Sequence, residues 1–560
     1  MLFDQHPSDG GRLRWRVCNY GVGLTAVLTK QVLTGPRRPL LRAARAGVRY
    51  VLDSGSYKNA SRGADYPRAL TVLARLGMLV GPLAYALSAR RSRAALQSRL
   101  ADDTRFVPSA VGVIELDHAL ADVELGHSAN GRAYGSLVAL VRLHGDSLTM
   151  IEVPAEQGRV TTAALVDAVW TAARAELEQH ARTHGCIDPA ALTPNALATG
   201  LPAIGHCPSR RIDEVEPPFV SVIVPTVRRP DGIQTCLESL RRLRYPRLEI
   251  IVVDNAPEDP RTRAVVEACS REDERVRYVA ESLPGSSVAR NRGVSEARGD
   301  ILAFTDDDVV VDVEWLRWMI EPFLRDARVG VVTGLVLPAR LDTPDQRWFE
   351  EHSGFSKGFE PRLFDRDEHR ADERLFYPYW GGVFGAGGGS MAFRPSLLKE
   401  IGGFDPALGA GSPALAGADI ESFSHAIIVG SRLAYEPRAV CWHDHRVDAA
   451  AVEKQMFNYG VGLTAILTKW LLRDPGLARA MVTQFVRLLA SLVGIRSSSS
   501  AVPQELSRLG KQLRMNRRRS TLGLQLRGYC LGPVLYLRSV IWAKRLRLRA
   551  VLTTARLPDE

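Results

Sequence analysis

Short apolar runs alternate with helix-patterned segments between about residues 217 and 450. Four short segments of four to six mostly apolar residues, at 220–224, 248–253, 276–279 and 301–304, are typical of buried parallel strands. Between them, apolar residues recur at helical spacing in 231–243, 261–270 and 287–297. Strands and helices that alternate in this way predict an α/β domain with a mostly parallel, Rossmann-like sheet and right-handed crossovers.

The strand predicted at 301–304 runs directly into Thr305 and three carboxylates, Asp306, Asp307 and Asp308. Ligands of open α/β sheets bind outside the carboxyl ends of the strands. Three acids placed there repel one another unless a positive group lies among them, and a divalent cation carrying a phosphate ligand suits them. A solvated acidic turn is the alternative interpretation of this triplet on its own.

A separate module is predicted over residues 105–210. Strand-like runs at 111–116, 136–141 and 150–153 precede an amphipathic helix at 161–184, and a linker rich in proline and charge follows at 202–218. The side chains of His184, Cys186, His206 and Cys207 are metal-ligand types, but their spacing matches no standard site. We therefore expect a small α/β module without a metal.

The two ends of the chain resemble each other. The segment NYGVGLTAVLTK at 19–30 repeats as NYGVGLTAILTK at 458–469, with one difference in twelve positions. Residues 1–100 thus look like a shortened, helical copy of the tail at 451–560. This copy is either a doubled docking element or a remnant of duplication without its own chemistry.

The tail carries clusters of lysine and arginine interleaved with leucine, tyrosine and tryptophan. This mixture favours an anionic membrane surface. Nucleic acid is the competing partner, and no recognition motif for it is present, so we expect none. No uninterrupted apolar run reaches the length of a clear membrane span, although 70–89 leaves a weak span open.

Composition agrees with an anionic partner, because the formal net charge is +11 and the sequence pI is about 9.4. The seven cysteines contain no CxxC pair, which predicts neither a zinc site nor a disulfide framework. A reducing cytoplasm is the simplest location, and the N-terminus shows no signal-peptide pattern. We expect the cytoplasmic face of a membrane, reached as a peripheral or weakly spanning protein.

Several motifs together resemble family 2 glycosyltransferases over about residues 217–470. They are VSVIVPTVRRPDGIQTCLESL, EIIVVDNAPED and SVARNRGVSEARGDILAFTDDDVVV, followed by GAGGGSMAFR, GGFD, GADIE and WHDHR. Their order and spacing are those of the family. The resemblance implies a GT-A fold for residues 217–450 and inverting transfer of a sugar from a nucleotide-sugar donor.

The same resemblance implies roles on the donor side. Pro225 and Thr226 would line the base pocket, Asp254 would accept hydrogen bonds from the nucleobase or ribose, and Arg290 would pair with the diphosphate. Asp306 would contact the ribose. For Asp254 a turn, and for Arg290 a solvated helix position, are the structural alternatives.

A metal site is implied by Asp306, Asp308 and His443, with Mn2+ or Mg2+ as the ion and Asp307 pointing away. Asp419 stands at the position of the catalytic base, which takes the proton of the acceptor hydroxyl. Ala418 departs from the family pattern, which commonly has a glutamate there.

The acceptor side would be formed by Trp380 and by the glycine-rich segment that includes Gly388 and Gly389, where backbone can approach a sugar closely. The acceptor would be a glycan or lipid-linked cell-envelope molecule. The alternative is a degraded transferase that binds a membrane glycan or a partner, since Ala418 departs from the pattern. A third possibility, a nucleotidyltransferase, lacks its glycine-rich loop near the first strand.

Overall fold

The structure is a computed structural model, and it describes residues 105–203, 207, 216–366, 377–379, 381–385, 387–474, 476 and 519–554. The chain divides into two compact units, Met1–Phe106 and Val107–Glu560, and only the second is described below. The predicted helical copy at 1–100 therefore lies outside the described residues, as do Trp380 and His206.

The small module is a three-stranded sheet covered by one long helix. Its strands are β1 (Ser109–Glu115), β3 (Ser136–Leu143) and β4 (Asp146–Pro154), in the order β1-β3-β4. Smaller elements are β2 (Val123–Glu124), β5 (Arg159–Val160), η1 (Pro189–Ala191) and α6 (Pro194–Thr199). The pairing of β1 with β3 is parallel and that of β3 with β4 is antiparallel.

The long helix of this module is α5 (Thr162–His184). Leu165, Val169, Ala173 and Leu177 recur every fourth residue, so they share one face and are buried against the sheet. The helix begins at the Thr161 cap and ends at Gly185, which has a left-handed conformation. The predicted strands and helix of the module are confirmed.

The second region of the unit is built on a mixed sheet with the order β10-β14-β11-β13-β9-β6-β7-β8, and β12 pairs with β14. The strands are β6 (Val220–Thr226), β7 (Leu248–Asp254), β8 (Val276–Ala280), β9 (Ile301–Phe304), β10 (Val309–Val311), β11 (Val329–Pro338), β12 (Arg362–Phe364), β13 (Met391–Phe393) and β14 (Arg432–His443). Strands β6 to β9 are parallel, and β13 is antiparallel to its neighbours β9 and β11.

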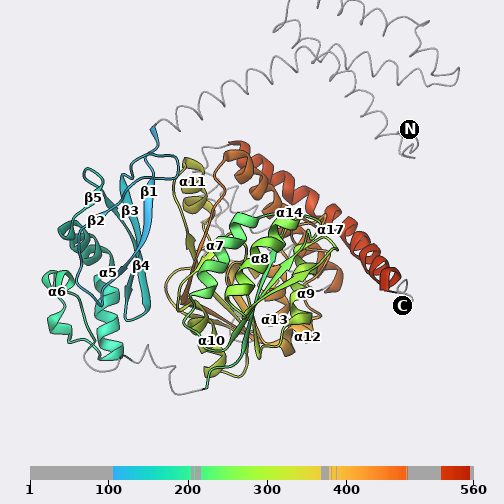
Figure 1. The fold of residues 1–560 in the computed structure, drawn as a ribbon, viewed down its shortest axis with the longest axis horizontal. Coiled ribbons are helices and arrows are strands. Elements are labelled where there is room, and N and C mark those ends of the chain that lie inside the picture. Colours follow the sequence, from blue (N-terminus) through green and yellow to red (C-terminus); the bar gives the residue numbers. More distant parts are fainter. Residues whose placement is uncertain are drawn as a thin grey trace, which may run out of the picture. The chain divides into compact units, whose positions relative to one another are not determined.

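Helices cover both faces of this sheet (Figure 1). One apolar core receives α7 (Pro230–Arg241), α8 (Pro260–Glu272) and α10 (Trp315–Arg325). The other receives α9 (Ser286–Glu296), α12 (Pro395–Ile401) and α13 (Ala418–Ile428). The helix α11 (Pro344–Ser353) and the turn η3 (Gly381–Val383) complete the region. The predicted Rossmann-like, mostly parallel α/β class is confirmed, as the GT-A resemblance implied.

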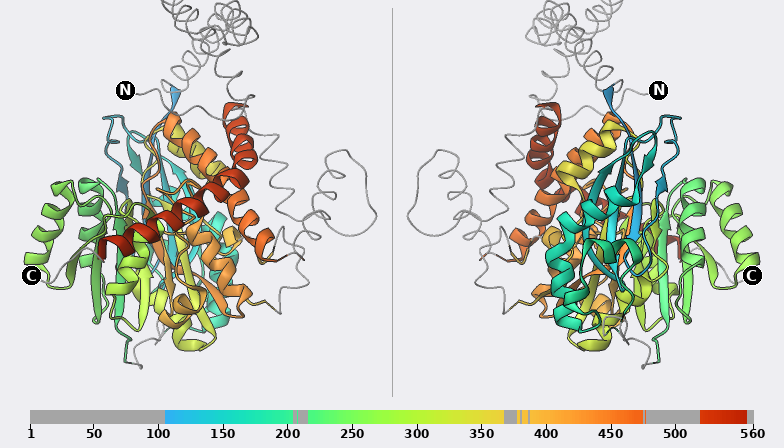
Figure 2. Two further views of the ribbon diagram at one scale, coloured as in Figure 1. Left: turned by 90° about the vertical axis from the view of Figure 1, so that its right-hand side faces the viewer. Right: turned by 90° about the vertical axis from the view of Figure 1, so that its left-hand side faces the viewer.

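Two long helices follow the sheet, α14 (Ala449–Arg473) and α17 (Arg519–Thr554), shown in orange and red in Figure 2. They cross where Gly460 and Gly528 meet. A Cβ atom at Gly528 would press on the Phe457 carbonyl oxygen, so glycine permits the close approach. The predicted helical character of the tail is confirmed over these residues. None of the described helices combines the length and the apolar character required to span a bilayer.

The small module packs directly on the large sheet. Leu140 of β3 joins Leu335, Leu337 and Val440 in one apolar cluster. Arg142 pairs with Asp312 at 2.8 Å, and Ser147 Oγ donates to the Pro437 carbonyl at 2.9 Å. These contacts place the module against β11 and β14, the strands that lead toward the predicted site.

Candidate active site

A cavity of about 830 Å³ lies at the carboxyl ends of the strands. Its walls come from the β6 end, the acidic segment after β9, the glycine-rich segment before β13 and the N-terminus of α13, together with α14 and α17. The cavity brings together Pro225, Thr226, Arg290, Asp306, Asp308, Gly388, Gly389, Asp419 and His443. Apart from Asp254 and the undescribed Trp380, every predicted site residue lines it.

The three acids point to different partners. Asp306 accepts a hydrogen bond from Arg290 Nη2 at 2.9 Å. Asp307 is buried and accepts from Thr226 Oγ1 at 2.7 Å and from Arg229 Nη1 at 2.6 Å. Asp308 accepts from the same Arg229 nitrogen at 2.8 Å. Asp307 is therefore held against the end of β6 and shares its arginine with Asp308.

His443 reaches this cluster through the register of the sheet. Val309, the residue after Asp308, pairs directly with His443 across β10 and β14, and the Asp444 N–H donates to the Asp308 carbonyl at 2.9 Å. His443 Nε2 consequently lies 3.5 Å from Asp308 Oδ1. Strand pairing thus joins two motifs that are more than a hundred residues apart in the sequence.

A second histidine and a carboxylate fix the orientation of the His443 ring. His445 Nε2 lies 2.9 Å from Glu350 Oε2, and its Nδ1 lies 3.0 Å from His443 Nδ1. The carboxylate accepts the His445 Nε2 proton, which leaves His445 Nδ1 to accept the His443 Nδ1 proton. In this assignment the lone pair of His443 Nε2 faces Asp308.

The charges of the cluster suit a hard cation. Burial lowers the pKa of His443 to about 4, so the ring is neutral near pH 7 and can be a ligand. Burial raises the pKa of Asp306 to about 6, against the pull of Arg290. Burial also opposes the charge of Asp308, but neighbouring cationic groups, which include Arg229 and Arg446, outweigh it and lower the pKa of Asp308. An imidazole lone pair that faces carboxylate oxygens fits a divalent cation between them.

Asp419 lies in the first turn of α13, on another wall of the cavity. Its Oδ2 accepts a hydrogen bond from the Gly388 N–H at 2.6 Å. A Cβ atom at Gly388 would collide with Arg290 Nη2 and approach Asp306 Oδ2. Glycine at this position lets one backbone segment contact the predicted base and the predicted metal ligand together.

Asp254 ends β7 opposite Thr226, as the strand pattern predicted, but its carboxylate is fully buried. It accepts hydrogen bonds from the Ala256 N–H at 3.0 Å and from the Tyr278 hydroxyl at 3.0 Å. The neighbouring Asn255 lines the cavity and Asp254 does not. In this structure Asp254 shapes the turn after β7, which is the alternative that we gave for it.

Two further motif residues bind α14 to the sheet region. Glu421 of the GADIE segment and Asp405 of the GGFD segment both contact Lys469 Nζ, at 2.7 Å and 2.8 Å. Lys469 is the last residue of the repeated segment at 458–469. Ala418 is buried in an apolar cluster with Ile466 and Trp470 of α14, so an acid at this position would lie among apolar side chains.

Sequence reasoning did not identify Arg229, Arg446, His445 and Glu350. Arg229 and Arg446 both reach Asp308, the second at 3.3 Å. The spacing of His443 and His445 carried a usable signal, since residues two apart at the end of a strand point to the same side. Glu350 lies on a distant helix and had no such signal.

The comparisons with known proteins agree with the motifs. Residues 221–402 match the family model described as glycosyl transferase family 2. Glycosyltransferase AglE of Haloferax volcanii is 35% identical over 102 residues, which are 18% of this chain and 34% of that protein. Glucosyl-dolichyl phosphate glucuronosyltransferase of the same organism is 25% identical over 188 residues, 33% of this chain and 56% of that protein. The chain thus spans between a third and just over half of these relatives.

Among solved structures, the mannosyltransferase PcManGT of Pyrobaculum calidifontis, in complex with GDP-Man and Mn2+, is similar at a TM-score of 0.34 and 20% identity. The likeness covers 58% of this chain and 87% of that one. On the strength of the family match and the motifs that line the cavity, the chain contains a family 2 glycosyltransferase domain.

Proposed function

We propose that the protein is an inverting, metal-dependent glycosyltransferase that moves a sugar from a nucleotide-sugar donor to a glycan or lipid-linked cell-envelope acceptor. The observation that carries the proposal is the convergence of Asp306, Asp308, His443 and Asp419 on one cavity. These residues come from three separate regions of the chain. They supply the ligands for a cation and a base for the acceptor.

The donor half of the cavity is the end of β6 with the acidic segment. Pro225 and Thr226 line the wall beside the acids, where a nucleoside would lie. Arg290 is nearly buried, and its Nε has no hydrogen-bond partner among the described residues. A guanidinium in such a wall suits a diphosphate, because charge-assisted hydrogen bonds to phosphate oxygens strengthen in a dry site.

The cation would be held by Asp306, Asp308 and His443, and either Mn2+ or Mg2+ suits this ligand set. A divalent ion held by these residues would neutralise the charge that develops on the leaving diphosphate. Arg229 and Arg446, which contact Asp308, balance the remaining negative charge of the acids.

Asp419 is the proposed general base. Its Oδ2 accepts a hydrogen bond from the Gly388 N–H and its Oδ1 accepts one from the Ile420 N–H, and the residue lines the cavity. The acceptor oxygen gives its proton to Asp419 and attacks the anomeric carbon, while the bond from that carbon to the diphosphate oxygen breaks. One such in-line displacement inverts the anomeric centre.

This mechanism is tested by titrating the full chain with a panel of nucleotide-sugars, with and without Mn2+, and following nucleoside diphosphate release. We expect metal-dependent release from one donor. Asp419→Asn should lower turnover by about 10²- to 10⁴-fold, the usual contribution of a general base, with donor affinity unchanged. Loss of donor binding in this variant would contradict the role of base. Metal-dependent binding without release from any donor and acceptor pair would favour the degraded, binding-only alternative.

Peripheral contact with the cytoplasmic face of a membrane is supported by α17. Leu531, Val534, Leu537 and Ile541 are exposed on one side of this helix, and Arg527, Arg538 and Lys544 are exposed near them. An exposed apolar stripe with basic flanks suits an anionic bilayer surface. One of the relatives is named for a lipid-linked sugar, which fits an acceptor held at such a surface.

Sedimentation with lipid vesicles tests this surface. Wild type should bind vesicles that contain anionic lipid more tightly than neutral vesicles. The double variant Leu537→Asp and Ile541→Asp should lose most of this binding, because it places two charges in the apolar stripe. Val429→Asp makes the same change at an exposed residue at the end of α13 and serves as the control. Equal vesicle binding by all three proteins would remove the membrane from the proposal.

A further inference from the structure

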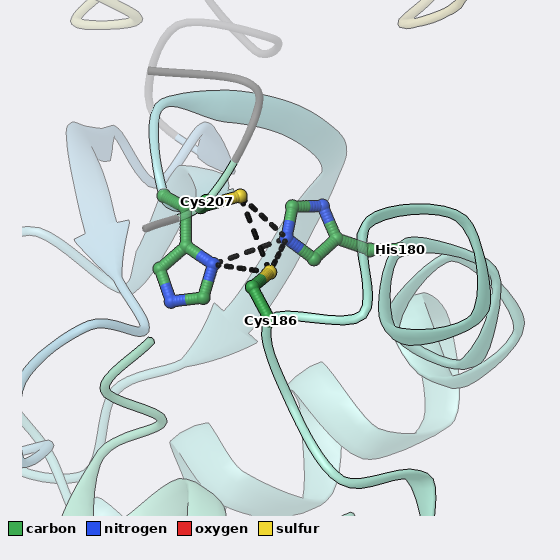
Figure 3. Close-up of side chains that lie close together, drawn as sticks. His180, Cys186 and Cys207 are labelled. Atoms are coloured by element: carbon green, nitrogen blue, oxygen red, sulfur yellow. Dashed lines mark hydrogen bonds between the residues drawn. The ribbon is translucent and has the colours of Figure 1, made fainter. Parts of the chain in front are cut away.

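Two histidines and two cysteines meet in the core of the small module, far from the active-site motifs in sequence. His144 lies in the turn between β3 and β4, His180 lies on α5, Cys186 follows that helix, and Cys207 lies beyond α6. One ligand atom from each lies within 4.8 Å of the others, and every one of the four residues is at most 4% exposed. Figure 3 shows His180, Cys186 and Cys207 pointing toward one another.

We propose that these four side chains form a structural zinc site. Zinc with two sulfur and two nitrogen ligands prefers a tetrahedron, with Zn–N of about 2.0 Å and Zn–S of about 2.3 Å, so the ligand atoms lie about 3.3–3.8 Å apart. The two inner nitrogens, Nδ1 of His144 and Nε2 of His180, are 3.1 Å apart. Cys186 Sγ is 3.4 Å from both, and Cys207 Sγ is 3.8 Å from His180 Nε2.

The outer nitrogens of both rings indicate which atoms carry protons. His144 Nε2 lies 3.0 Å from the Leu201 carbonyl oxygen, which can only accept, so this nitrogen carries the proton. His180 Nδ1 lies 3.0 Å from Asp146 Oδ2, the arrangement of a metal-bound histidine with a carboxylate behind it. Both inner nitrogens then direct lone pairs at each other and at the sulfur atoms.

A cation between the four ligand atoms would bind the lone pairs that otherwise face one another. On zinc binding, each thiol loses its proton to solvent and each sulfur forms a bond to the metal, so two thiolates balance the charge of one Zn2+. The resulting neutral cluster is compatible with the apolar core around it. Sulfur and imidazole ligands favour zinc over magnesium or calcium, and four protein ligands leave no position for a substrate.

Two other arrangements compete with zinc. The sulfur atoms of Cys186 and Cys207 are 3.2 Å apart, which is longer than a disulfide bond but close enough for one to form on oxidation. A protonated His180 could also bridge Asp146 and His144, but it would not account for two sulfur atoms beside the same nitrogen. The expectation of no metal was based on spacing alone and paired these cysteines with His184 and His206 in place of His144 and His180.

Zinc content of the full chain, purified under reducing conditions, tests the proposal. Wild type should hold about one zinc per chain, and Cys186→Ser and Cys207→Ser should hold almost none. Cys269→Ser, which changes a cysteine outside the cluster, should keep the metal. Asp308→Asn should keep it as well, which separates this site from the catalytic one. A wild type without zinc, or a Cys186→Ser protein that retains it, would overturn the proposal.

A second measurement needs no cysteine variant and so does not depend on how those variants fold. Replacing zinc by Co2+ in the wild type should give the intense visible absorption of tetrahedral cobalt with thiolate ligands. If no such absorption appears, and two fewer thiols react in denaturant than the seven cysteines of the chain, the cluster is a disulfide and the proposal is wrong.

Discussion

Two of the histidine pairs in the described part of the chain each have a carboxylate beside them, and we propose different roles for them. In the proposed catalytic site His443 contacts His445, and Glu350 contacts the far nitrogen of His445. In the small module His144 contacts His180, and Asp146 stands behind the latter. In both pairs a carboxylate determines which nitrogen holds the proton and which one offers its lone pair.

The two pairs differ in the groups that the nitrogen lone pair faces. His443 faces carboxylate oxygens on the wall of a large cavity, where a hard cation can exchange and a substrate can enter. The module pair faces two sulfur atoms in a core that is closed to solvent. In these two proposed metal sites, ligand softness and solvent access differ, whereas both contain a histidine pair.

The largest effect that separates the two regions should come from Asp308, one of the proposed metal ligands. Asp308→Asn removes a charge that would hold the cation, so metal-dependent donor binding and turnover should fall by at least about 10²-fold. The measurement is nucleoside diphosphate release over a Mn2+ titration.

The control is Asp444→Asn, because Asp444 pairs with Arg340 and does not line the cavity. Washing wild type with EDTA and adding back Mn2+ should remove and restore activity while the zinc content stays constant. If EDTA-treated protein loses both metals together with its activity, the two regions are not independent.

A smaller effect should follow from the carboxylate behind the catalytic pair. Glu350→Gln weakens the orientation of His445 and, through it, of His443, so the Mn2+ concentration for half-maximal activity should rise about 10- to 100-fold. Turnover at saturating Mn2+ should recover to near the wild-type value. A loss of turnover that no amount of Mn2+ restores would show that Glu350 does more than position the ligand.

Asp146 is the carboxylate beside the histidine pair of the small module, and its substitution is expected to leave turnover unchanged. Asp146→Asn should speed zinc loss to a competing chelator by about 10-fold and lower the melting temperature, with kcat and KM unchanged. Zinc release is followed with a colorimetric chelator and stability by calorimetry. Since Asp146 also lies 3.9 Å from Arg438 of β14, a change in KM would reveal that the module influences the catalytic sheet.

The parallel part of the sheet, β6 to β9, was predictable because apolar runs and strand ends are local properties of the sequence. Residues 220–224 and 301–304 were recognised from their runs alone, and the acids after β9 occupy the predicted crevice. Asp254 shows the limit of prediction from strand ends. Its position at the end of a strand predicted that it lines the crevice, but its carboxylate oxygens accept hydrogen bonds from Tyr278 and Ala256.

The parts that sequence reasoning missed depend on contacts between distant segments. Glu350 reaches His445 from a separate helix, and no spacing along the chain encodes that meeting. The Cys and His cluster collects its members from four segments of the module, so the absence of a CxxC pair was uninformative. Only the packing of α5 on the three-stranded sheet brings them together.

The cavity wall formed by α14 and α17 lies outside the segment that matches the family model. The family match ends at residue 402, before either helix begins, whereas Pro225, Arg290 and the acids all lie within it. The helix pair is held to the sheet region by the Lys469 ion pairs and by an apolar cluster that joins Ile466 and Trp470 to Ala418. Because Ala418 directly precedes the proposed base Asp419, this packing couples the position of the helix pair to the position of that carboxylate.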